Sequence, residues 1–387
     1  MATGFLPGGR DSWYFVLSMH LARTWLVAIA MVTIAGAARA EPAAIDRLEV
    51  SERGSRFFTA DSLDLDTAGE PVRFSTGVAG TYAHKLRTYG SDAEGQVTTL
   101  VDNAFALHPG ASVVLAPGAR FALDIPAVFQ TGAQTNLSRV AYFEPASPAL
   151  GDIRAGIDVR LFDTAETITA VGVQIWLPTA NAENYTGDGY ARVGLHVGTA
   201  INVDWLHAAA RLGYVVRREL EPFGSVSLGS EARGVFAAGY RATSNGTLTE
   251  VVVGPELHAV TIARDAFRHK ATPVETLLGA HLGFGDARVG VGAGTAVVTG
   301  FGSATFRGFF SIEWTPGATA ARVRDRDGDG VPDIDDACPD VPGDASARGC
   351  PPAPRDRDAE GVVAPLQPDQ PEPVEAPVPP PAEGSRP

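Results

Sequence analysis

The sequence predicts an all-β protein, an antiparallel transmembrane β-barrel of about 12 strands, with a range of about 10 to 14. Three observations predict this fold class. The chain begins with the features of an export signal, and apolar and polar residues alternate over most of residues 71–316. The alternating stretches are also long, at about ten to fifteen residues each.

Residues 1–40 are expected to be a secretory signal peptide that is removed after Ala40. Basic Arg23 precedes an apolar run over residues 25–34, and small residues follow up to the cleavage site. The apolar run is too short to span a bilayer, which takes about twenty helical residues. Met19 is expected to be the true start. We expect residues 41–70 to form an N-terminal periplasmic segment.

Alternation is clearest over residues 152–162, where every second residue is apolar and Arg154 and Asp158 occupy the other face. We place strand starts near residues 72, 96, 119, 151, 167, 191, 205, 230, 247, 273, 286 and 305. The pair Asn245-Gly246 predicts a hairpin turn, because both residues tolerate positive φ. Three prolines must lie at bulges or strand ends, since proline cannot donate to a β-ladder; they are Pro117, Pro126 and Pro255.

Alternation also fits a soluble β-sandwich, so strand length and aromatic placement decide between the two folds. Sandwich strands average about five or six residues, whereas a tilted strand needs about nine to eleven to cross a membrane. Aromatic residues gather at strand ends, where the interfacial girdles of a barrel would lie; they are Trp176, Tyr190, Trp205, Tyr240 and Trp314. Gly and Ala dominate the polar face, as expected for a packed lumen. The barrel is therefore favoured.

Charged residues of the polar face are the candidates for lumen lining, namely Arg154, Asp158, Arg160, Arg192, His196 and Arg211. They fit either a selectivity zone or an internal ion-pair network. The histidines have no metal-ligand spacing. The glycine run Gly290, Gly292 and Gly294 alternates through a strand with no helix after it, so it does not indicate a nucleotide-binding loop. We therefore expect no enzyme.

The net charge of −14 is concentrated at the C-terminus, because residues 321–387 hold fifteen acidic and seven basic side chains. Phosphate binding needs basic patches, so nucleic acid is not an expected partner. The two cysteines, Cys338 and Cys350, are close in sequence. In an exported protein such a pair favours a disulfide, with two free thiols as the alternative.

Residues 325–340 carry the most specific motif, DRDGDGVPDIDDACPD. Its oxygen donors match positions 1, 3, 5, 7, 9 and 12 of a calcium loop; they belong to Asp325, Asp327, Asp329, Val331 (through its carbonyl), Asp333 and Asp336. Gly330 allows the tight turn at position 6. Carboxylates at this density repel one another without a cation, which favours a calcium site over a solvated acidic linker.

This stretch is not an EF-hand, because Pro332 and the pair Cys338-Pro339 replace a strand residue and the exiting helix. It resembles the thrombospondin type 3 repeat, DxDxDGxxDxxDxCP. The resemblance implies calcium bound by the five aspartates and a disulfide joining Cys338 to Cys350. We assign the repeat to residues 320–350.

A barrel followed by this repeat resembles the OmpA-like proteins of myxobacteria, over about residues 70–350. The similar stretches include residues 122–132, 150–162, 176–189 and 300–316. In that family a peptidoglycan-binding domain comes next, but residues 351–387 contain twelve prolines and no apolar periodicity. We expect this segment to be a disordered, extended tail.

Three functions from different classes follow. The first is a structural protein of the outer membrane, in contact with its lipid, whose barrel spans residues 71–316. Its calcium repeat and tail would lie in the periplasm and contact peptidoglycan or a periplasmic protein. The second is a passive channel for small solutes, since about twelve strands enclose more space than eight. The third is a secreted calcium-binding β-sandwich.

Overall fold

The computed structural model describes residues 43–65, 71–89, 97–115, 118–137, 140–164, 166–203, 205–244, 246–317, 327–331, 336–338 and 340–351. The predicted signal peptide, Pro117, Asn245 and the tail from residue 352 onward lie outside these residues. The chain divides into two compact units, residues 1–324 and residues 325–387.

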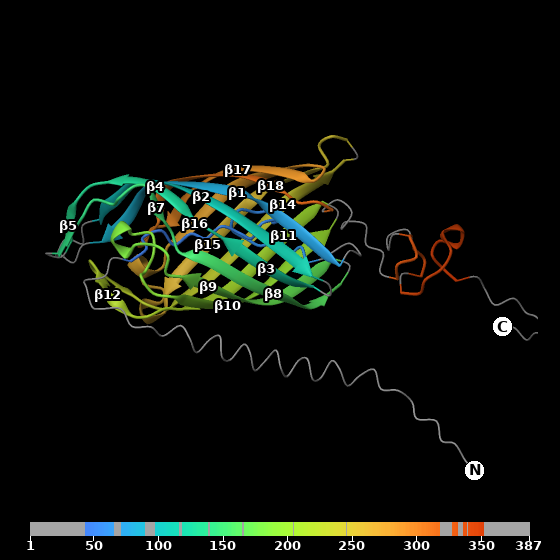
Figure 1. Ribbon diagram of the computed structural model, residues 1–387, viewed down its shortest axis with the longest axis horizontal. Helices are drawn as coiled ribbons and strands as arrows, with labels where there is room; N and C mark the ends of the chain where they lie inside the picture. The colour runs from blue at the N-terminus through green and yellow to red at the C-terminus, as the bar shows by residue number, and fades with distance from the viewer. Residues whose placement is uncertain are drawn as a thin grey trace, which may run out of the picture. The chain divides into compact units, whose positions relative to one another are not determined.

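Antiparallel strands form the wall of the first unit (Figure 1). In chain order they are β1 (Val72–Tyr89), β2 (Val97–Leu115), β3 (Ala119–Asp124), β8 (Ile153–Asp163), β9 (Thr167–Leu177), β10 (Arg192–Val203), β11 (Leu206–Val216), β14 (Glu231–Thr243), β15 (Glu250–Ile262), β16 (Val274–Phe284), β17 (Ala287–Val298) and β18 (Ala304–Trp314). β1 pairs with both β2 and β18, so the sheet closes into a barrel. The closed sheet rules out the sandwich.

Two strands of the wall are interrupted. β4 (Ala127–Gly132) continues β3 along β2, and β7 (Ala149–Leu150) precedes β8 and pairs with β4. The fourteen segments of the sheet therefore occupy twelve positions. Each predicted strand start lies within three residues of an observed one, and the predicted 12-stranded barrel is confirmed.

Two of the three prolines predicted at bulges or strand ends lie in the described chain, and they behave differently. Pro126 lies in the break between β3 and β4, as predicted. Pro255 was expected at a bulge or strand end but lies inside β15, in continuous register with β16. On its other side, the register between β14 and β15 has no paired residues between Ala237↔Glu256 and Tyr240↔Val253. A residue without an N–H fits at this gap because no ladder hydrogen bond is required there.

The barrel has an apolar exterior and a polar interior. On β11, the Leu212 side chain is 67% exposed whereas the adjacent Arg211 is 8% exposed. Large exposed apolar residues occur around the wall, as expected of a surface that faces lipid. Of the aromatic residues predicted at the interface, Trp205, Tyr240 and Trp314 are exposed, but Trp176 is buried. No helix of the described chain is long and apolar enough to cross a membrane.

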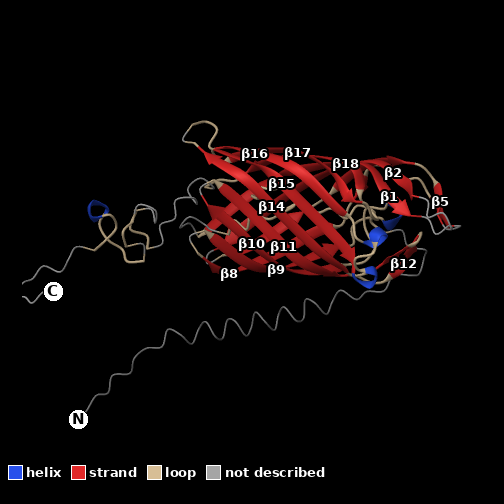
Figure 2. Cartoon of the chain, turned by 180° about the vertical axis from the view of Figure 1, so that it is seen from behind, coloured by secondary structure: helices blue, strands red, loops and turns tan. Residues whose placement is uncertain are grey.

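The two ends of the barrel differ in their connections. At the end where β1 begins and β18 ends, here called the turn end, short turns join β8 to β9, β10 to β11 and β16 to β17. The opposite, loop end carries longer connections and small elements (Figure 2). These elements are β5 (Thr135–Leu137), β6 (Val140–Tyr142), η1 (Ala182–Asn184), β12 (Leu220–Phe223), β13 (Val226–Leu228), η2 (Ala263–Asp265) and η3 (His269–Ala271).

Residues 43–65, here called the plug, lie inside the barrel. Ala43 and Ile45 are fully buried in an apolar cluster with loop-end residues that include Phe223 and Phe301. At the other end of the plug, the Asp64 carboxylate pairs with Arg73 near the start of β1. These residues therefore do not form the separate periplasmic segment that we expected. Their charged side chains face inward-pointing wall residues, and most of them are buried.

The second unit is small and is closed by a disulfide. Cys338 and Cys350 are joined, with their Cα atoms 5.1 Å apart. A β-bridge links Asp344 to Cys350, and η5 (Ala345–Ala347) lies between them.

Candidate functional site

The plug folds back on itself in the turn-end half of the lumen. The Ser51 amide donates to the Phe58 carbonyl at 2.7 Å, and the Ser51 hydroxyl donates to the Phe57 carbonyl at 2.6 Å. Within the same bend of the plug, the Ser55 hydroxyl donates to the Ala60 carbonyl at 2.9 Å. The plug thus presents a compact, internally hydrogen-bonded loop to the barrel wall.

One glutamate of the wall holds the backbone of this loop. Glu256 on β15 is 1% exposed, and its carboxylate accepts hydrogen bonds from the amides of Phe58, Thr59 and Ala60 at 2.8, 2.7 and 3.3 Å. The Thr59 hydroxyl also donates to it at 2.7 Å. Three consecutive amides on one carboxylate fix the path of the chain, since buried amides need a partner.

All eight charged side chains of the plug lie within ion-pair distance of a charged residue of the wall. The pairs are Asp46–Arg307, Arg47–Glu231, Glu49–Arg233, Glu52–Arg154, Arg53–Glu313, Arg56–Glu250, Asp61–Arg120 and Asp64–Arg73. These partners come from β1, β3, β8, β14, β15 and β18. An unpaired buried charge is costly, and each of these charges of the plug has a partner in the wall, so the plug and wall neutralise each other.

Glu49 has more arginine partners than any other carboxylate of the plug. It forms an ion pair with Arg233 on β14 and lies 3.9 Å from a guanidinium nitrogen of both Arg154 on β8 and Arg211 on β11. Arg154 also donates to the adjacent Val50 carbonyl at 2.8 Å. One side chain of the plug therefore connects three wall strands.

The predicted lining residues fall into two groups. Arg154, Asp158, Arg192 and Arg211 are buried inside the barrel, and His196 lies with its Nε2 2.7 Å from Asp158. Arg160 is more exposed, near the turn end, where it pairs with Asp163 at 3.2 Å. The inward-facing residues form an ion-pair network, one of the two arrangements considered from the sequence.

The sequence interpretation missed the plug, with Glu49, and several of its wall partners, such as Glu256. Residues 43–65 contain eight charged residues of mixed sign, which was the available signal. Trp176 was also misplaced at the membrane interface. The guanidinium carbons of Arg192 and Arg233 lie 5.2 and 5.5 Å from the centre of its ring. These cation–π contacts favour the ring on the lumen side of the wall.

The loop-end half of the lumen is less densely filled. A cavity of about 120 Å³ lies between residues 44–50 of the plug and the wall. Apolar wall residues such as Val101 and Val128 line part of it, and Glu49 and Arg233 line another part. The lumen therefore retains a small space on the loop side of the folded half of the plug.

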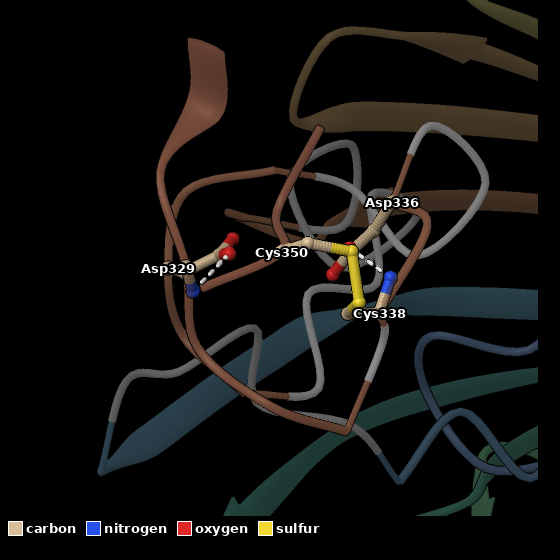
Figure 3. The surroundings of a disulfide bond; sticks show 5 residues. Asp329, Asp336, Cys338 and Cys350 are labelled. Atoms are coloured by element: carbon tan, nitrogen blue, oxygen red, sulfur yellow. Dashed lines mark hydrogen bonds between the residues drawn. A yellow bond between two sulfur atoms is a disulfide. The ribbon is translucent and has the colours of Figure 1, made fainter. Parts of the chain in front are cut away.

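The second unit contains a cluster of carboxylates. Oxygens of Asp327, Asp329 and Asp336 lie within 4.8 Å of one another, and Figure 3 shows the last two beside the disulfide. Asp336 is 9% exposed and its Oδ2 has no hydrogen-bond partner, while its Oδ1 accepts from the Cys338 amide at 2.7 Å. This cluster has the hard oxygen donors that a divalent cation such as calcium prefers.

Backbone amides and a glycine shape this cluster. Asp329 accepts from the amides of Val331 and Gly343 at 2.8 and 2.9 Å, which tie two turns to one carboxylate. Gly349 has φ +74°, and a Cβ there would lie 2.1 Å from Asp336 Oδ1. Of the ligands predicted from the sequence, Asp325 and Asp333 lie outside the described residues. Asp327, Asp329 and Asp336 are brought together.

Comparisons with known proteins give structural neighbours only. No family model matches the chain, and no curated protein matches it. Among solved structures, the COG4313 outer membrane channel from Pseudomonas putida F1 is similar at 13% identity and a TM-score of 0.45, covering 65% of this chain and 98% of that one. The NanC porin is similar at 10% identity and a TM-score of 0.39, covering 62% of this chain and 98% of the porin. The CymD monoaromatic hydrocarbon channel is similar at 11% identity and a TM-score of 0.38, covering 70% of this chain and 98% of that channel.

Proposed function

We propose that this protein is an outer-membrane β-barrel with a structural role in the cell envelope, whose lumen is closed by its own plug. The observation that carries the proposal is the pairing of all eight plug charges with the wall. A path for solutes would require breaking several of these buried pairs. Breaking one such pair costs about 3–5 kcal/mol.

The unequal ends of the barrel support an orientation. Outer-membrane barrels have short periplasmic turns and longer external loops. The turn end, where β1 begins and β18 ends, is then periplasmic. In this orientation the second unit and the tail are a periplasmic stalk and arm, with peptidoglycan or a periplasmic protein as the partner.

The stalk is proposed to bind calcium through Asp327, Asp329 and Asp336. The support is the cluster of their oxygens within 4.8 Å and the unpartnered, buried Oδ2 of Asp336. Asp325, Asp333 and the Val331 carbonyl complete the predicted ligand set, because calcium takes about six to eight oxygens. Bound calcium would supply the positive charge that these carboxylates need at close range.

The test of the closed barrel is conductance of the full-length protein in planar bilayers. We expect heat-modifiable gel mobility, which reports a folded barrel, together with no stable open current. Steady open channels from the folded wild-type protein would contradict the proposal.

A passive channel for small solutes is the second candidate. It is favoured by the cavity of about 120 Å³ and by the attachment of the plug to the wall through polar contacts. Such contacts can be displaced by ions or ligands. Under this alternative, the same bilayer experiment gives transient openings of the folded wild-type protein.

A further inference from the structure

The position of Glu49 suggests a ligand site in the lumen wall. Its carboxylate lies among three guanidinium groups, those of Arg154, Arg211 and Arg233, here called the arginine site. The three arginines come from β8, β11 and β14, so the barrel wall alone assembles them. Guanidinium groups recognise planar carboxylates by paired hydrogen bonds, which a lysine cannot reproduce.

The arginine site depends on the plug for neutralisation. In the described part of the chain, the ion pairs of Arg154 are with Glu49 and Glu52, and that of Arg211 is with Glu49. Both glutamates belong to the plug, whereas Arg233 also pairs with Glu231 of the wall at 2.9 Å. Arg154 is 3% exposed and Arg211 is 8% exposed. Buried guanidinium groups without an anion are costly, so this wall needs a carboxylate.

The cavity of the loop-end half reaches this site. Glu49, Arg154 and Arg233 all contribute to its lining, next to the apolar wall. Its volume of about 120 Å³ is large enough for several water molecules or for a small organic anion. A carboxylate in the cavity would therefore lie beside the group that now neutralises the arginines.

We propose that the arginine site binds small organic carboxylates and that Glu49 is an internal competitor that occupies it while the plug is in place. This inference rests on the proposed closed lumen and adds a ligand class to it. A carboxylate arriving from the cavity replaces one anion by another, so the buried arginines stay neutralised. Cations and neutral solutes gain no such partner.

The test is chemical rescue of full-length Glu49→Ala by acetate. The variant removes the internal carboxylate and leaves space for the probe, and we expect its barrel to unfold at a lower temperature than wild type. Sodium acetate at tens of millimolar should raise that temperature by at least about 3 °C, because a ligand of the folded state stabilises it. Acetamide, and sodium chloride at equal ionic strength, should not.

The matched control is Glu49→Ala combined with Arg211→Gln, which should lose the acetate effect. An inserted Glu49→Ala barrel that does not respond to acetate overturns the inference, as does an equal response to acetamide or chloride. Retention of the effect in the double variant also overturns it. If Glu49→Ala inserts poorly, the folded yield on refolding is compared instead, and acetate alone must raise it. Wild-type conductance tests the closed lumen separately, so the two failures are distinguishable.

Discussion

At the scale of single residues, Glu256 has an unusual number of partners. Its carboxylate satisfies three amides and one hydroxyl of the plug in a site closed to water. Removing an acceptor from buried donors costs about 1–3 kcal/mol per group, which exceeds the net gain of forming an ordinary hydrogen bond. The position of the folded half of the plug thus depends on Glu256.

We predict that Glu256→Ala loosens the plug. Protease should then cleave near Arg53 or Arg56 at least about tenfold faster than in wild type, corresponding to about 1.4 kcal/mol of lost protection. Glu256→Gln retains one acceptor oxygen and should be intermediate. The control is Glu219→Ala, because the Glu219 side chain is 77% exposed at the loop end. Equal cleavage of Glu256→Ala and the control would show that this carboxylate does not hold the plug.

In the acidic cluster, Asp329 resembles Glu256 in that its carboxylate accepts hydrogen bonds from backbone amides. We predict that Asp329→Ala lowers calcium affinity of the full-length protein at least about tenfold, because it removes one carboxylate and frees two amides. Calorimetric titration in detergent measures the affinity, and heat-modifiable mobility checks the barrel. Asp344→Ala, an exposed acidic control outside the cluster, should bind as wild type does. Unchanged affinity in Asp329→Ala would contradict the assigned site.

At the scale of elements, the wall strands were predictable and the plug was not. A wall strand has lipid on one face and the lumen on the other, so its own residues alternate, as Arg211 and Leu212 show. The plug has no period of its own. Arg53 meets Glu313, 260 positions later, and no local pattern in residues 43–65 identifies such a partner. The acidic cluster was recognisable because its carboxylates are close in sequence.

The plug also gives an element-scale prediction. Deleting residues 43–65 should convert a closed barrel into one that conducts in planar bilayers, because the plug charges and the folded loop leave the lumen. A synthetic peptide of residues 43–65 should reduce the current, whereas a scrambled peptide of the same composition should not, since the wall binds specific amides and charges. A deletion barrel that inserts but remains closed would show that other residues block the lumen.

At the scale of the whole molecule, the chain combines two units stabilised by different physics. The barrel is held by a closed hydrogen-bonded sheet and a buried ionic network. The second unit has a disulfide that closes a short loop and a cluster of carboxylates. A unit this small cannot bury a large apolar core, so cross-links and metal are expected to supply most of its stability.

This difference predicts two separable thermal transitions in the full-length protein in detergent. The midpoint temperature of the second unit's transition should fall by at least about 10 °C when calcium is chelated. It should fall further when the disulfide is reduced, because calcium and the disulfide both act on that unit. The barrel transition should stay within about 2 °C, since none of its described residues is a cysteine or belongs to the acidic cluster. Scanning calorimetry measures both, with heat-modifiable mobility as an independent report on the barrel. A barrel transition that moves together with calcium would show that the two units unfold as one, and the stalk would then contribute to barrel stability.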